Sequence, residues 1–134
     1  MHFMNTKELI ETDFEVLSPD LNLGQMTYFI ARSKRDLFPV VDENGMMEGM
    51  IKMNDIRNLM FEQDLYEKIS VRDLMYMPEF FISPNDPIEV IVDKFKTCGR
   101  YNLAVLDDGK YIGFISRARV FSVYRDTMAD LSFE

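Results

Sequence analysis

The chain has 134 residues, 47% of them hydrophobic and 28% charged, which is enough apolar material for one core or for two small repeats that share one. No apolar run approaches the roughly 18 residues of a membrane-spanning helix, and polar residues from His2 to Glu8 interrupt the opening before a secretory signal can develop. The net charge of −8 argues against nucleic acid as a partner, because an acidic surface repels a polyanion.

Few residues are suited to catalysis. The only histidine, His2, lies at the end of the chain, so neither a histidine-based triad nor a zinc site is expected. Cys98 is the only cysteine, which excludes an internal disulfide and fits the reducing cytoplasm. The sequence also contains no phosphate-binding Gly-x-x-x-x-Gly-Lys-Ser/Thr loop. We therefore expect no enzyme activity, no metal and no required cofactor.

The first half of the chain predicts a strand, a helix, a hairpin and a second helix. An extended segment ends at Ser18-Pro19, because a residue before proline is pushed out of the α region. The next helix has one apolar face, formed by Leu23, Met26 and Ile30. Two strands, Phe38–Val41 and Met46–Lys52, surround Asn44-Gly45, a pair that favours a type I′ turn with positive φ at both residues. The last helix has apolar residues at Met53, Ile56, Leu59 and Met60.

The second half predicts the same order of elements. After Ser83-Pro84, a helix is expected to begin at Pro87, with Asp86 and Glu89 as a capping box. Its apolar stripe consists of Ile88, Ile91, Val92 and Phe95. The following strands, which include Leu103 and Tyr111, are separated by Asp108-Gly109. The final helix has one face with Val120, Val123, Tyr124 and Thr127.

The two halves are an internal repeat. An offset of 65 residues aligns three blocks of the first half with Arg72–Met75, Ile82–Asn85 and Leu103–Asp107. One residue fewer in the second hairpin turn changes the offset to 64, after which Gly49–Ile51 aligns with Gly113–Ile115. We therefore predict a first repeat at 1–62, a linker at 63–70 and a second repeat at 71–134.

Each repeat is a β-α-β-β-α unit, and such a unit buries too little surface to be stable alone. The expected fold class is therefore α+β. The two repeats are expected to pack sheet to sheet with pseudo-two-fold symmetry.

The repeat and its hairpin motifs resemble the tandem CBS-domain pair, also called the Bateman module. The resemblance covers nearly the whole chain and rests on the repeat period, on 38–45 (FPVVDENG) and on 49–55 (GMIKMND). Members of this family are regulatory modules that dimerise through the CBS helices and commonly bind adenine nucleotides. The resemblance thus implies a homodimer with ATP, ADP or AMP as the candidate ligand. The eleven methionines suit such a contact and suit core filling equally well.

A narrower resemblance concerns the end of the chain. The segment 113–121 (GFISRARVF), followed by Tyr124-Arg125, is similar to the cytosolic tail of bacterial voltage-gated-type chloride channels and transporters. The segment 77–81 (MPEFF), near the start of the second repeat, is similar to the same proteins. This resemblance implies a membrane transport domain N-terminal to Met1 and a cytoplasmic module tethered through it to the inner membrane.

The family's nucleotide pattern is Gly-h-h-Ser/Thr-x-x-Asp, in which h is apolar, the hydroxyl contacts phosphate and the Asp accepts hydrogen bonds from the ribose. The first repeat keeps Asp55 but has Lys52 in place of the hydroxyl, and a lysine can meet phosphate as a point charge. The second repeat keeps Ser116 but has Arg119 in place of the Asp, and arginine has donors only. We therefore favour the Asp55 half as the nucleotide site.

Two further positions complete the candidate site. The family places Phe38, with Pro39 beside it, against the nucleotide; Leu103, the equivalent of Phe38, is better explained by core packing. The structural alternatives are that Asp55 lies in a solvated helical turn, that Ser116 caps a helix and that Phe38 packs in the core. Another alternative is a small basic rim for an anion, formed by Lys52, Arg117 and Arg119.

The favoured function is a cytosolic regulatory and dimerisation module of a chloride channel or transporter that senses an adenine nucleotide. One alternative is a free-standing CBS protein that regulates another protein in trans. The other is a purely structural dimerisation module without a ligand.

Overall fold

The computed structural model describes residues 6–132, which form two compact units. The first-hairpin unit consists of Asp13–Glu79 and Gly109–Tyr111. The second-hairpin unit consists of Phe80–Asp108, of Ile112 onward and of the opening of the chain through Thr12. No helix in 6–132 is both long enough and apolar enough to cross a membrane.

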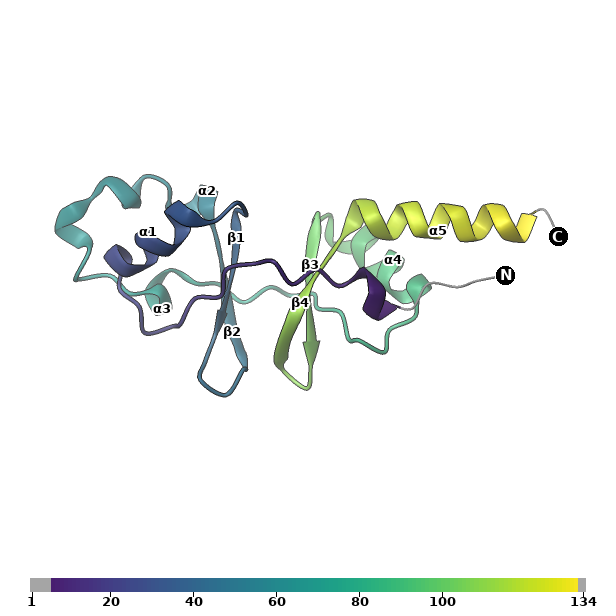
Figure 1. The fold of residues 1–134 in the computed structure, drawn as a ribbon, viewed down its shortest axis with the longest axis horizontal. Helices are drawn as coiled ribbons and strands as arrows, with labels where there is room; N and C mark the ends of the chain where they lie inside the picture. The colour runs from purple at the N-terminus through teal and green to yellow at the C-terminus, as the bar shows by residue number, and fades with distance from the viewer. Residues whose placement is uncertain (1–5, 133–134) are drawn as a thin grey trace. The chain divides into compact units, whose positions relative to one another are not determined.

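The first-hairpin unit contains a two-stranded antiparallel sheet and several short helices (Figure 1). The strands are β1 (Leu37–Val41) and β2 (Met47–Lys52). The helices are α1 (Leu23–Arg32), α2 (Met53–Ile56) and α3 (Val71–Leu74), with 3-10 turns η2 (Leu59–Phe61) and η3 (Gln63–Leu65). The predicted second helix of this repeat is therefore a single α-helical turn followed by 3-10 turns.

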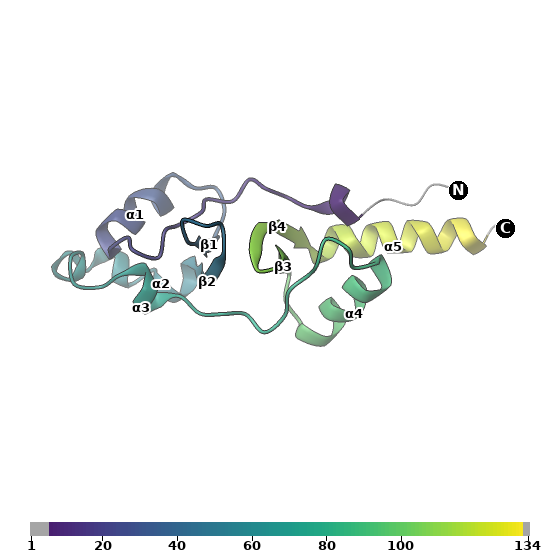
Figure 2. The same cartoon turned by 90° about the horizontal axis from the view of Figure 1, so that it is seen from below.

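The second-hairpin unit has longer helices. It contains η1 (Thr6–Leu9), α4 (Ile88–Cys98), β3 (Asn102–Asp107), β4 (Lys110–Ser116) and α5 (Arg117–Ser132). The two views show α4 and α5 side by side next to the β3–β4 hairpin (Figures 1 and 2). The α+β class predicted from the repeat is confirmed.

The opening segment of each repeat packs in the unit that contains the other repeat's hairpin. Segment η1 and helix α3 occupy equivalent positions at the offset of 65, yet Leu9 of η1 is buried in the second-hairpin core and Val71 of α3 in the first-hairpin core. The bridge Glu11–Phe114 fastens the first segment, and its counterpart Tyr76–Met50 fastens the second. Each compact unit thus combines chain from both repeats.

The apolar helix faces lie where the periodicity predicted them. Leu23, Met26 and Ile30 of α1 are buried in one core, and Ile91, Val92 and Phe95 of α4 are buried in the other. A capping box begins α1, because the Asn22 side chain accepts from the Gln25 N–H and the Gln25 side chain accepts from the Asn22 N–H.

The capping box predicted for α4 is wrong. The helix begins at Ile88 after an extended Pro87, and the Asp86 carboxylate accepts from the Ser83 N–H at 3.0 Å and from the Lys94 ammonium at 2.8 Å. A charge-assisted bond to an ammonium is stronger than a cap on a neutral N–H, so the carboxylate turns toward Lys94. Burial raises the pKa of Asp86, but the bonds from Lys94 and Ser83 outweigh burial and hold that pKa below its ordinary value.

The first strand of each repeat is reduced to one parallel bridge, Leu17–Val40 in the first and Ile82–Val105 in the second. Leu17 donates to the Pro39 carbonyl, and Val41 donates to the Leu17 carbonyl. The next ladder bond would need an N–H two residues after Leu17, where Pro19 has none. Pro84 ends the second ladder two residues after Ile82 in the same way.

The two hairpin turns differ because of the one-residue deletion. Asp108 and Gly109 have φ values of 50° and 84°, as the predicted type I′ turn requires. The same prediction for Asn44-Gly45 is wrong, because only Gly45 has positive φ. The extra residue there gives a loop closed by a bond from Gly45 N–H to the Asp42 carbonyl, with a register shift at Val40/Val41.

The equivalent glycines Gly49 and Gly113 have different neighbours, and this difference predicts how much each tolerates a larger side chain. A Cβ at Gly113 would lie 2.5 Å from the Glu11 carbonyl oxygen, whereas one at Gly49 would meet only the flexible Met75 side chain at 3.0 Å. We expect Gly113→Ala to lower the free energy of unfolding by about 1–3 kcal/mol, because the backbone bridge at Glu11 must shift. Gly49→Ala is the matched control and should cost clearly less. Urea unfolding followed by circular dichroism measures both, and equal losses would contradict the explanation.

Candidate functional site

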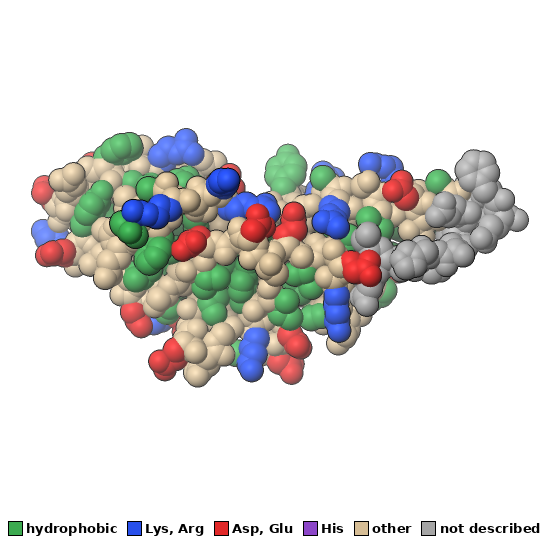
Figure 3. All heavy atoms as spheres, viewed as in Figure 1, with side chains coloured by type: hydrophobic (Ala, Val, Ile, Leu, Met, Phe, Trp, Pro, Cys, Tyr) green, Lys and Arg blue, Asp and Glu red, His purple; other side chains and the backbone are tan. Residues whose placement is uncertain are grey.

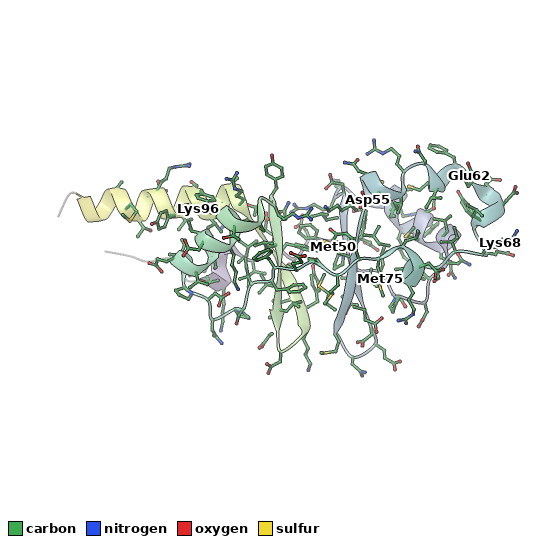
Figure 4. The ribbon with its side chains drawn as sticks, turned by 180° about the vertical axis from the view of Figure 1, so that it is seen from behind. Met50, Asp55, Glu62, Lys68, Met75 and Lys96 are labelled. Carbon is green, nitrogen blue, oxygen red and sulfur yellow. The ribbon has the colours of Figure 1, made fainter. Side chains whose placement is uncertain are left out.

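Lys52 and Asp55 lie one helical turn apart in the first-hairpin unit. Lys52 is the last residue of β2, paired with Leu37 of β1, and its extended backbone is the N-cap of α2. Asp55 is exposed in that helix, beside the end of β2 that lies away from the hairpin turn (Figure 4). The described residues place no hydrogen-bond donor or cation in contact with the Asp55 carboxylate, and no carboxylate in an ion pair with Lys52.

The backbone of α2 adds little to this site. The helix has only four residues, and the N–H of its first residue, Met53, donates to the Asp36 carbonyl at 2.9 Å. The Met53 N–H is therefore taken up within the fold, and the Lys52 ammonium is the cation that remains for an anion at this end of β2. The two side chains offer a cation for phosphate and a carboxylate that can accept two hydroxyl hydrogen bonds.

Phe38 and Pro39 belong to β1, the strand that pairs with β2 and so with the strand that ends at Lys52. The Phe38 side chain is fully buried in the first-hairpin core, and the residue pairs with Ile51 of β2. Pro39 is buried as well, and its carbonyl accepts from the Leu17 N–H at 2.9 Å. Leu103, the equivalent of Phe38, is buried in the other core. Phe38 thus supports the strand that ends near Lys52 without exposing surface of its own.

Ser116 and Arg119 lie in the second-hairpin unit and have local structural contacts. The Ser116 hydroxyl accepts from the Arg119 N–H at 3.1 Å and so caps α5. The Arg119 guanidinium donates to the Glu8 carbonyl at 3.5 Å. Arg117, the third member of the alternative basic rim, lies over the Phe121 ring at 5.0 Å. The structure therefore gives Ser116 and Arg119 the role of fastening the start of α5.

One residue near Lys52 was missed by sequence reasoning. The Lys52 ammonium lies 5.2 Å from the centroid of the Tyr76 ring. Tyr76 belongs to no recognisable motif and lies 24 residues away along the chain. Only the repeat alignment singles out Tyr76. It aligns Tyr76 with Glu11, so one copy has a tyrosine where the other has a glutamate.

The charged surface shows no single-sign field on the face in Figure 3, where basic and acidic side chains are interspersed over each unit. Residues 6–132 also contain no group of three or more His, Cys, Asp and Glu side chains placed to hold a metal ion. The carboxylates that do have ordered partners are mostly in ion pairs, such as Asp13 with Arg35 at 2.6 Å.

The family model of the CBS domain matches the chain twice, over residues 7–62 and 71–126. The chain therefore belongs to the CBS-domain family, and its two domains in tandem form a regulatory module. No curated protein matches the chain.

Solved structures of several CBS proteins share the fold. The CBS domain of a membrane protein from Sphaerobacter thermophilus is 17% identical, with coverage of 90% of this chain and 88% of that chain and a TM-score of 0.72. CBSX2 in complex with AMP is 21% identical, with coverage of 95% of this chain and 99% of that chain and a TM-score of 0.72. The soluble part of a magnesium transporter is 16% identical, with coverage of 94% of this chain and 50% of that chain and a TM-score of 0.73.

Proposed function

We propose that this regulatory module binds an adenine nucleotide through Lys52 and Asp55 of the first-hairpin unit. The observation that carries the proposal is the contrast between the two copies of the motif. Lys52 and Asp55 have no ionic partner among the described residues, whereas Ser116 and Arg119 are bound to local backbone. The first copy alone keeps both a cation and a carboxylate available to a ligand.

The two side chains would have complementary roles. The Asp55 carboxylate accepts hydrogen bonds from the ribose hydroxyls, and the Lys52 ammonium meets a phosphate. CBSX2, which has the same fold, was crystallised with AMP, and ATP, ADP and AMP are the ligands to compare. Binding regulates the module only if the nucleotide prefers one arrangement of the pair over another.

A charge reversal tests the site. Asp55→Arg should abolish nucleotide binding, because it replaces the ribose acceptor with a donor. Asp64→Arg is the matched control, since Asp64 is also an exposed carboxylate in a short helical element of the same unit, and it should bind like the wild type. Calorimetric titration gives the affinities.

Saturation with nucleotide at 100 times Kd should add about 2.7 kcal/mol to the free energy of unfolding of the wild type. Equal affinity of both variants would overturn the site, and absence of wild-type binding would favour the structural module.

We further propose that the module regulates a chloride channel or transporter to which it is joined. The support is the resemblance of 113–121 and Tyr124-Arg125 to chloride-channel tails. The fold also occurs in the soluble part of a magnesium transporter and in a CBS-containing membrane protein. The free-standing protein acting in trans is the competing function.

The reading frame that encodes the chain separates these two functions. A joined transport domain predicts several apolar segments of about 20 residues each, encoded upstream in the same frame. The native protein should then remain with the membrane fraction after a carbonate wash. A stop codon directly upstream, together with recovery of the native protein in the soluble wash fraction, would contradict the joined arrangement and favour regulation in trans.

The module is also proposed to form a homodimer through its helices. In the first-hairpin unit α1 and η2 pack against each other, and each exposes a large aromatic side chain: Tyr28 is 56% exposed and Phe61 is 80% exposed. Exposed aromatic side chains of this kind are enriched in protein interfaces.

Replacing the more exposed aromatic tests the dimer. Phe61→Asp should shift the protein to monomer, because a carboxylate at the contact would have to be desolvated. Tyr101→Asp is the control, since Tyr101 is 76% exposed but lies in the loop before β3 rather than on a helix. Sedimentation velocity reports the mass of each variant. A Phe61→Asp dimer with unchanged stability would exclude this face.

A further inference from the structure

We propose that Tyr76 is a positioning residue for Lys52, and that its ring keeps the lysine charge available to the phosphate of a bound nucleotide. The inference rests on the nucleotide site proposed above. It assigns a function to a side chain that the family's nucleotide pattern does not include.

Tyr76 is fixed by three contacts with one residue of β2. The Met50 N–H donates to the Tyr76 carbonyl at 2.8 Å, and the Tyr76 N–H donates to the Met50 carbonyl at 3.0 Å. The Tyr76 hydroxyl also donates to the Met50 sulfur at 3.4 Å. Met50 is buried in β2, two residues before Lys52, and is marked in Figure 4. Backbone and side chain together therefore hold the ring close to the end of the strand.

The ring holds the Lys52 ammonium without neutralising it. The ammonium lies 5.2 Å from the ring centroid, within the range of a cation–π interaction. Some other cations among the described residues are held by carboxylates, as Arg35 is by Asp13 and Lys94 by Asp86. A carboxylate cancels a lysine's charge, whereas an aromatic face only orients it. Lys52 is thus restrained, and no carboxylate among the described residues forms an ion pair with it.

The other repeat shows what the same backbone holds when the lysine is absent. Glu11, the equivalent of Tyr76, makes the same paired bonds with Phe114, at 2.7 and 2.9 Å. Phe114 is the equivalent of Met50, and Ser116 is the equivalent of Lys52. The bridge is common to both copies, but the side chains differ together: lysine accompanies tyrosine, and serine accompanies glutamate. A glutamate at position 76 would pair with Lys52 and compete with phosphate, and the first copy has a neutral ring there.

A double-mutant cycle with Tyr76→Leu and Lys52→Met tests the assignment. Tyr76→Leu should weaken ADP binding by about fivefold in the wild type, from loss of a cation–π contact, and should have no effect in the Lys52→Met background. Tyr76→Phe keeps the ring and should bind ADP like the wild type. Tyr76→Glu should weaken binding more than Tyr76→Leu. Adenosine, which lacks phosphate, should bind the wild type and Tyr76→Leu equally.

Each result decides between the two proposals. If the wild type binds ADP but Tyr76→Leu has the same effect with and without Lys52, the role of Tyr76 is overturned and the site stands. If the wild type binds no nucleotide, both are overturned. The ligand-free protein gives a check that needs no variant: the Lys52 ε-methylene protons should show an upfield ring-current shift in the NMR spectrum. An unshifted resonance would show that the ring does not hold the lysine.

Discussion

The paired backbone bonds between an opening segment and the second hairpin strand are the constraint on which each unit depends. A two-stranded hairpin has little stability alone and leaves a sheet edge with unpaired N–H and C=O groups. The bonds of Glu11 with Phe114 and of Tyr76 with Met50 occupy those edges. Leu9 and Val71, which belong to the same two segments, are buried in the two cores. One arrangement thus completes the sheet and the core at once.

The same bonds explain why the candidate site lies where it does. The bridge at Met50 is two residues from Lys52, so the segment that completes the sheet also brings a side chain to the end of β2. Because α2 is a single turn and its first N–H is bonded to the Asp36 carbonyl, the charged groups at this end are the side chains of Lys52 and Asp55. In the other copy the equivalent end is followed by the sixteen-residue α5, and Ser116 serves that helix as its cap.

Much of the fold was predictable because local patterns dictate it. The apolar stripes of α1 and α4 and the turn at Asp108-Gly109 follow from periodicity and from the residues that tolerate positive φ. Each opening segment packs in the unit that contains the other repeat's hairpin, and this exchange of opening segments was not predictable from the sequence. The 65-residue offset between the repeats shows which segments are alike, but it does not show which unit each segment joins. The capping box at Asp86 failed because Lys94, a full two turns along the helix, is a stronger partner for the carboxylate. Tyr76 escaped notice because its contact with Lys52 is tertiary.

The exchange of opening segments also sets an order on the folding of a nascent chain. The first-hairpin unit can assemble once synthesis has passed Glu79, with only the short segment Gly109–Tyr111 still to come. The second-hairpin unit cannot be completed then, since residues up to Thr12 must wait for strands made about a hundred residues later. Closing so long a loop is slow compared with local contacts. During that interval Leu9 has no core to enter, so the η1 segment, although made before both hairpins, becomes protected from proteases and from aggregation only after the second hairpin has formed.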